Sequence, residues 1–139
     1  MSLLEPTKKM SKSLGQGHVI ELADGPDTIE KKLKKAVTDS GEGKSPGVEN
    51  LFLLLKNFGE KEIYEQFLAV NNKGGLQYGD LKKAVSDAIA MYFGEFREKR
   101  AMLLSEPEKL KDLLDLGARK AKATAEKTMK DVRRLVGLR

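Results

Sequence analysis

Residues 45–59 read SPGVENLFLLLKNFG, and this stretch decides the fold. The five consecutive apolar residues from Leu51 to Leu55 cover nearly all sides of a helix, which is typical of a helix at the centre of a core. Ser45 is a suitable N-cap, Pro46 fits the first helical turn, and Gly59 is suited to end the helix. We therefore predict a central helix over about residues 46–58.

Helical periodicity continues on both sides of this stretch. An apolar stripe formed by Ile29, Leu33, Ala36 and Val37 predicts a helix that begins near Pro26. We expect Asp24 to cap the helix that begins near Pro26. Residues 105–108 are expected to form the capping box of a later helix, whose buried side consists of Leu110, Leu113 and Leu114. Further helices are predicted over about residues 60–70 and about residues 80–104, where Gly94 weakens the helix only locally. Another is predicted from residue 107 onward. At Gly117 this helix either ends, so that a last helix follows, or continues without a break.

The composition favours helices over a β-sandwich. Of 139 residues, 40% are hydrophobic but only 6% are aromatic, so the core must consist mainly of aliphatic side chains. The absence of cysteine excludes disulfides and thiolate metal sites, and the single histidine excludes a histidine zinc cluster, so no metal ligands are assigned. No apolar run approaches the ~20 residues of a membrane span, and we expect a cytoplasmic protein. The predicted fold class is all-α, with a short extended segment at residues 18–22 and a loop at residues 39–47.

Positive charge is concentrated in the last segment of the chain. The net charge of +5 arises entirely after residue 116, where eight basic residues accompany two acidic ones. On a helix the apolar residues from Ala118 to Val136 gather on one side, with the basic residues opposite. Contact with an RNA backbone and plain solvation of a charged face both remain open. The candidate RNA-contacting residues are Arg119, Lys122, Lys130 and Arg133.

A second candidate site is the run Lys9-Met10-Ser11-Lys12-Ser13, which is followed by Gly15 and Gly17. Lysine ammonium groups and serine hydroxyls are donors that suit phosphate oxygens, and glycines let a loop bend close to a ligand. The residues alone leave two interpretations, a phosphate-binding loop and a solvated basic loop.

The sequence of this run resembles the KMSKS signature of class I aminoacyl-tRNA synthetases. The preceding Pro-Thr-Lys resembles the same position in the tryptophanyl branch of this class. Further blocks look like those of the bacterial family in the family's order, so the resemblance covers nearly all of residues 5–138; the tyrosyl branch fits less well. Leu14-Gly15 departs from the family, where the loop often continues with Asp. The matching blocks are residues 27–32, 36–40, 47–51, 78–83 and 117–138.

The resemblance implies the C-terminal portion of a synthetase, without the Rossmann domain and its HIGH motif. It implies ATP binding, with Mg²⁺, by the KMSKS loop, which we define as residues 9–13: Lys9, Met10, Ser11, Lys12 and Ser13. Lys12 would bind the pyrophosphate oxygens with Lys9 assisting, and both are the expected catalytic residues. The implied partners are tRNA(Trp), L-tryptophan through the missing domain, and a second copy in a homodimer.

The expected domain organisation has three parts. Residues 1–3 are expected to be a start-codon scar, residues 4–23 to hold the KMSKS loop and the extended segment, and residues 24–139 to form a helical domain that recognises the tRNA anticodon. Alone, this chain is expected not to form adenylate. Two alternatives remain: a non-catalytic helical RNA-binding or regulatory module in which the loop is a relic, and helices that serve mainly to pair with another chain. A surplus of exposed Leu or Phe would support a missing partner surface.

Overall fold

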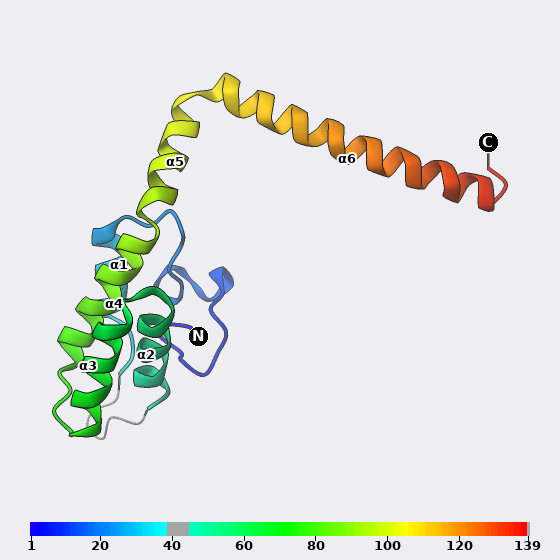
Figure 1. The fold of residues 1–139 in the computed structure, drawn as a ribbon. Coiled ribbons are helices and arrows are strands. Elements are labelled where there is room, and N and C mark those ends of the chain that lie inside the picture. The colour runs from blue at the N-terminus through cyan, green and yellow to red at the C-terminus, as the bar shows by residue number, and fades with distance from the viewer. Residues whose placement is uncertain (39–44, 139) are drawn as a thin grey trace. The chain divides into compact units, whose positions relative to one another are not determined.

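The computed structural model describes residues 1–38 and 45–138, and within these ranges every regular element is a helix (Figure 1). The all-α prediction is confirmed. The chain divides into two compact units, residues 1–97 and residues 98–139. The elements are the short 3-10 helices η1 (Lys12–Leu14) and η2 (Gln16–His18), and the α-helices α1 (Pro26–Lys34), α2 (Pro46–Phe58), α3 (Lys61–Asn72), α4 (Tyr78–Tyr92), α5 (Gly94–Ser105) and α6 (Pro107–Leu135).

Helix α2 is the centre of the first unit, as its sequence predicts. The Ser45 hydroxyl accepts a hydrogen bond from the Val48 amide at 3.3 Å, and the Gly59 amide donates to the Leu55 carbonyl at 2.8 Å. Leu55 is fully buried, whereas Leu53 is 51% exposed, so one side of α2 faces solvent. Most of the loop expected at residues 39–47 lies outside the described residues, and Pro46 and Gly47 already belong to α2.

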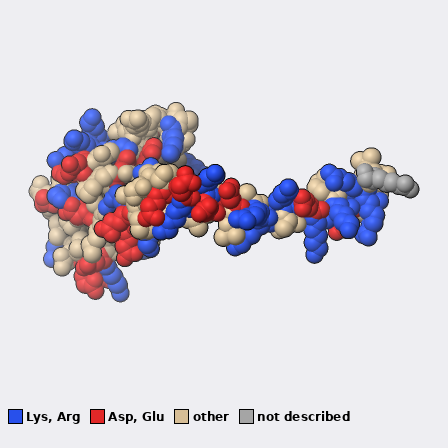
Figure 2. Space-filling view, turned by 90° about the horizontal axis from the view of Figure 1, so that it is seen from above, with Lys and Arg blue, Asp and Glu red and all other residues tan. Residues whose placement is uncertain are grey.

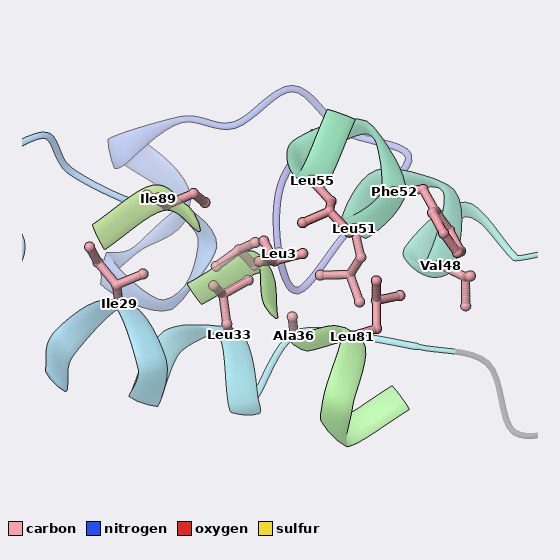
Figure 3. Packing of buried hydrophobic residues seen from close by; sticks show 11 residues of the cluster. Leu3, Ile29, Leu33, Ala36, Val48, Leu51, Phe52, Leu55, Leu81 and Ile89 are labelled. Atoms are coloured by element: carbon pink, nitrogen blue, oxygen red, sulfur yellow. The ribbon is translucent and has the colours of Figure 1, made fainter. Parts of the chain in front are cut away.

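The core forms where α1 and α2 pack against α4, and α3 packs against α2. Figure 3 shows Leu3 placed among side chains from all three of the core helices α1, α2 and α4. Burying a leucine or isoleucine of this kind contributes about 1.5–3 kcal/mol. As expected, the buried cluster is aliphatic apart from one phenylalanine; it consists of Leu3, Ile29, Leu33, Ala36, Val48, Leu51, Phe52, Leu55, Leu81, Val85 and Ile89.

The first three residues are an integral part of this unit. Leu3 is 1% exposed, and its carbonyl accepts a hydrogen bond from the Val37 amide at 2.8 Å. Ser2 is fully buried. Residues 1–3 therefore do not behave structurally as a scar appended to the fold. The first 23 residues also pack with α1, α2 and α4 in one unit, so the structural division falls near residue 97 and not at residue 24.

The chain between the loop and α1 differs in two details from the prediction. His18 ends η2, so it does not begin an extended segment, and Val19 after it has extended backbone, with φ −133° and ψ 140°. Asp24 does not cap α1, whose N-cap is Gly25. Its carboxylate instead accepts hydrogen bonds from the Glu21 amide at 2.8 Å and from the Lys32 ammonium at 2.6 Å. The ammonium of Lys32, a side chain only 13% exposed in the second turn of α1, is a stronger partner for this carboxylate than a neutral amide.

The long helix predicted over residues 80–104 is interrupted. Helix α4 ends at Tyr92, Phe93 leaves helical geometry with φ −95° and ψ 14°, and α5 begins at Gly94. The Phe93 ring packs against Phe58 of α2, with ring centroids 5.5 Å apart. This aromatic contact between distant segments, together with the low helix propensity of glycine, accounts for a break that periodicity alone does not reveal.

The second unit also departs from prediction at the start of α6. Ser105 belongs to α5 and donates its hydroxyl to the Met102 carbonyl at 2.7 Å, so the predicted capping box does not form. Helix α6 runs through Gly117 without a break, and none of its residues is buried. Leu113 is 51% and Leu114 65% exposed, so the expected buried side is wrong. Within the described residues 98–138, the end of α5 is the one other helical segment, so most of α6 has no neighbour in its own unit against which to bury an apolar face.

Candidate phosphate-binding loop and basic helix face

The KMSKS loop presents its polar groups to solvent and is held by one apolar side chain. Lys9 and Lys12 are exposed, whereas Met10 between them is half-buried and packs against the core cluster. The Ser11 hydroxyl caps η1 by accepting from the Ser13 amide at 3.4 Å, and the two serine hydroxyls lie 2.8 Å apart. The loop therefore brings two ammonium groups and two hydroxyls to the surface within five residues.

A glycine sets the direction in which the chain leaves this loop. Gly15 has a φ of +110°, in a region that residues with a side chain rarely adopt. Its amide donates to the Lys12 carbonyl at 3.1 Å, and its own carbonyl accepts from the His18 amide at 3.2 Å. The bend predicted from the glycines of this segment is thus located at Gly15.

One lysine of the KMSKS loop and the lysine just before the loop each pair with a carboxylate. Lys12 Nζ lies 3.5 Å from a carboxylate oxygen of Glu21, with the two side chains 76% and 39% exposed. Lys8, just before the loop, pairs with Glu5, and this hydrogen bond holds the pKa of the Glu5 carboxyl below its usual value. Lys12, which is expected to bind phosphate, is therefore already paired with a carboxylate, that of Glu21.

Replacing Glu21 with glutamine is expected to strengthen pyrophosphate binding by the loop, because the carboxylate competes with phosphate oxygens for Lys12. An exposed ion pair is worth about 0.2–1 kcal/mol, which corresponds to a gain of at most about fivefold in affinity. Isothermal titration of the chain with inorganic pyrophosphate measures this gain. Glu30→Gln, which removes a carboxylate paired with Lys34 on α1, is the matched control and should leave the affinity unchanged. Equal gains in both variants would indicate a general effect of net charge.

The base of the loop contains residues that the sequence did not single out. The buried Ser2 hydroxyl lies 2.9 Å from Nδ1 of His18, and the Leu3 amide donates to the His18 carbonyl at 3.1 Å. His18 is thus a packing residue whose ring nitrogen lies within hydrogen-bond distance of Ser2. Asn50 of α2 is buried below Ser2. The available signal for Asn50 was a polar residue directly before the apolar run from Leu51 to Leu55.

The second candidate site is the basic face of α6. Figure 2 shows Lys and Arg side chains gathered along the C-terminal half of this helix. At about 100° per residue, the four candidate residues fall within an arc of about 80°, and over 14 residues they extend along about 21 Å of helix. All four side chains are exposed: Arg119, Lys122, Lys130 and Arg133. Lys122 lies 3.7 Å from Glu126, so this charge is partly compensated.

A family comparison identifies this arrangement of loop and helices. The model of the tRNA synthetases class I (W and Y) family matches residues 1–94, which include the whole KMSKS loop and α1 to α4. The chain belongs to this family. Residues 1–3, which the structure places in the fold, lie inside the matched range of this class I synthetase.

Curated relatives of this class I synthetase extend the match to its second unit. The chain is 39% identical to the tryptophan--tRNA ligase of Bacillus anthracis and 40% identical to that of Oceanobacillus iheyensis, in each case over 99% of the chain. It spans about 43% of the length of these relatives. The similarity therefore covers α6 as well as the loop, and corresponds to less than half of a complete ligase.

Solved structures show the same fold. The tryptophanyl-tRNA synthetase of Campylobacter jejuni complexed with ADP and tryptophan matches with a TM-score of 0.77 and 31% identity, over 99% of this chain and 44% of that one. The enzyme of Mycoplasma pneumoniae matches with a TM-score of 0.74 and 32% identity, over 100% of this chain and 45% of that one. The prediction of a tryptophanyl-type synthetase portion is confirmed.

None of the helices in residues 1–38 and 45–138 is long and apolar enough to cross a membrane. Within the same ranges, no group of three or more acidic or histidine side chains gathers to hold a metal ion.

Proposed function

We propose that this chain is the C-terminal part of a tryptophan–tRNA ligase, which activates tryptophan with ATP to tryptophanyl-adenylate and transfers the tryptophan to tRNA(Trp). The observation that carries the proposal is the KMSKS loop, which lies inside the family match with Lys9, Lys12 and Ser13 exposed and Ser11 half-buried. The names of the relatives support the substrate, as does the neighbouring structure that holds ADP and tryptophan.

The loop's role follows from where charge moves in adenylate formation. The tryptophan carboxylate attacks the α-phosphate of ATP, a bond from carboxylate oxygen to phosphorus forms, and the bond to the leaving pyrophosphate breaks. Negative charge then accumulates on the pyrophosphate oxygens. Lys12 binds these oxygens, Lys9 assists, and the hydroxyls of Ser11 and Ser13 donate hydrogen bonds. Donors that are in place before this charge develops lower the barrier without reorganisation.

The remaining parts of the activity are assigned outside this chain. The tryptophan pocket and the rest of the ATP site belong to the portion of the relatives that the chain does not span. Mg²⁺ arrives with ATP and neutralises phosphate charge together with the lysines. We extend the proposal to a homodimeric complete enzyme in the cytoplasm, in which the helical units of this chain contact tRNA.

The proposal is tested by tryptophan-dependent exchange of pyrophosphate into ATP. The coding sequence upstream of residue 1 is read for a nucleotide-binding segment with an HIGH-like motif, and the complete product is purified beside this chain. Exchange is expected for the complete product only. Exchange by the 139-residue chain alone would contradict the assignment of the tryptophan pocket to the missing portion, and no exchange by the complete product would reject the ligase.

Removing the basic face of α6 is expected to weaken tRNA(Trp) binding and its dependence on salt. If each of the four residues neutralises one phosphate, replacing all of them with alanine lowers the slope of log affinity against log salt by about 3 to 4. Filter binding of the chain at several salt concentrations measures the slope. The altered residues are Arg119, Lys122, Lys130 and Arg133.

The control for this experiment removes the same charge elsewhere. It replaces four exposed lysines of the first unit, Lys31, Lys35, Lys61 and Lys73, with alanine. An equal loss in both variants would mean that net charge, and not the face of α6, holds the tRNA.

A non-catalytic RNA-binding module is the alternative function. It is favoured by one observation, that the basic excess of the chain lies after residue 116, mostly on a helix without a buried residue. This function requires tRNA binding that depends on α6 in a complete gene product without exchange activity. The same two assays therefore separate it from the ligase.

A further inference from the structure

Asn50 is a buried polar residue whose hydrogen bonds all go to the start of the chain. It lies on the core side of α2 with 5% of its surface exposed. Its Nδ2 donates to the carbonyls of Met1 at 3.1 Å and Ser2 at 3.3 Å, and its Oδ1 accepts from the Met1 nitrogen at 2.9 Å. A buried carboxamide is tolerated only when its donors and acceptor are satisfied, so this network selects one backbone position for residues 1 and 2.

Ser2 connects the backbone that Asn50 binds to the segment that carries the KMSKS loop. Its hydroxyl accepts from the Glu5 amide at 3.1 Å and lies 2.9 Å from Nδ1 of His18, and its own amide donates to the Lys8 carbonyl at 2.8 Å. Ser2 is itself fully buried. The backbone at Lys8, immediately before the KMSKS loop, is therefore hydrogen-bonded to Ser2, which is itself hydrogen-bonded to Asn50.

The chain that leaves the loop is tied to the same point. The Leu3 amide donates to the His18 carbonyl at 3.1 Å, so the two ends of residues 4–17 meet beside Ser2 and Leu3. Leu3 is anchored in the core below. Both ends of the segment that carries the KMSKS loop thus depend on residues 2 and 3, and α2 reaches these residues through Asn50.

We propose that Asn50 is a positioning residue for the KMSKS loop: by binding the backbone of residues 1 and 2, it sets where Lys9 to Ser13 stand relative to α2. The phosphate ligand of the loop rests on the proposed function, whereas the positioning itself does not. It follows that the loop and α2 move as one body, and that a change at Asn50 acts on the loop more than on the core.

Hydrogen exchange of the purified chain tests this positioning. In Asn50→Ala the amides of residues 8–18 are expected to exchange at least tenfold faster, while amides in the core positions of α4, such as Leu81 and Val85, change less than twofold. Asn57→Ala is the matched control, because Asn57 lies on the same helix, is exposed, and donates only to the Leu53 carbonyl. It should change neither group of amides.

Two results would overturn the proposal. Uniform acceleration across the loop and the α4 amides would show that Asn50 merely stabilises the fold, and unchanged exchange at residues 8–18 would show that the loop is held without it. If Asn50→Ala fails to fold, Ser2→Ala takes its place, since it removes the hydroxyl that contacts Glu5 and His18 but keeps Leu3 in the core. The same selective acceleration is expected, and its absence rejects the proposal.

A titration with inorganic pyrophosphate separates this inference from the proposed function. Amide shifts of Lys9 to Ser13 in the unaltered chain report binding, and Asn50→Ala is expected to weaken it at least threefold, while Asn57→Ala leaves it unchanged. Failure of the unaltered chain to bind counts against the phosphate-binding role of the loop, and the exchange experiment still decides the positioning. Equal affinity of the unaltered chain and Asn50→Ala counts against Asn50.

Discussion

Replacing Lys12 with alanine is expected to lower the kcat of tryptophan-dependent pyrophosphate exchange by about 10²–10³-fold in the complete synthetase. The removal of one preorganised donor to developing charge costs on the order of 3–4 kcal/mol, because no water takes its place with the same geometry. Since Lys12 is assigned to oxygens whose charge grows in the transition state, the KM for tryptophan should change little. Steady-state exchange kinetics at saturating ATP measure both quantities.

The control for Lys12 is available four residues before it, at the exposed Lys8. Lys8→Ala also removes one exposed ammonium group, but Lys8 precedes the KMSKS loop and pairs with Glu5. It should leave kcat within about threefold, the size expected for an exposed ion pair. A loss at Lys8 as large as that at Lys12 would assign the effect to the charge of the loop as a whole and would remove the specific role of Lys12.

Gly47→Ala is expected to destabilise the first unit by about 3 kcal/mol or more. Gly47 is buried in the first turn of α2, and a Cβ atom there would lie 2.2 Å from the Val37 carbonyl oxygen and 2.9 Å from its carbon. These are backbone atoms, so the contact is relieved only by moving α2 away from the segment after α1. Strain of this kind outweighs the gain of about 1 kcal/mol in helix propensity. Urea unfolding followed by circular dichroism measures the loss.

Gly79 provides the comparison for Gly47. It occupies the first turn of α4, and a Cβ atom at this position meets nothing within 4 Å. Gly79→Ala should therefore be neutral or stabilise the chain by up to about 1 kcal/mol, through helix propensity and a less flexible unfolded chain. Equal unfolding midpoints for the two variants would show that α2 does not approach Val37 as closely as the structure indicates.

The parts of the fold that could be predicted from sequence depend on local signals. The Ser45 cap, the Gly59 terminator and the apolar run between them act within one helix, and they gave α2 with its bounds. The KMSKS loop was found because its residue types are adjacent in the chain. What these residues do to a nucleotide stays a prediction, as do the four RNA contacts on α6.

The parts that could not be predicted depend on contacts between distant residues. Nothing near Leu3 in the sequence indicates that it fills the core between α1, α2 and α4, and the break at Phe93 follows from its contact with Phe58. The Asp24 carboxylate pairs with the Lys32 ammonium and does not cap the N-terminus of α1. The apolar face of α6 was located correctly on the helix, but periodicity does not state whether a second element covers it.

The hydrogen bonds from Asn50 to Met1 and Ser2 join residues 49 and 48 positions apart, and this separation has a consequence during synthesis. The ribosome synthesises the KMSKS loop before it synthesises Asn50, the residue that positions the loop. Contacts of such long range form late, because the intervening chain must first lose its freedom. The loop therefore acquires its place only after α2 has emerged and docked, and a nascent chain stopped before Asn50 carries the whole motif without a fixed position for it.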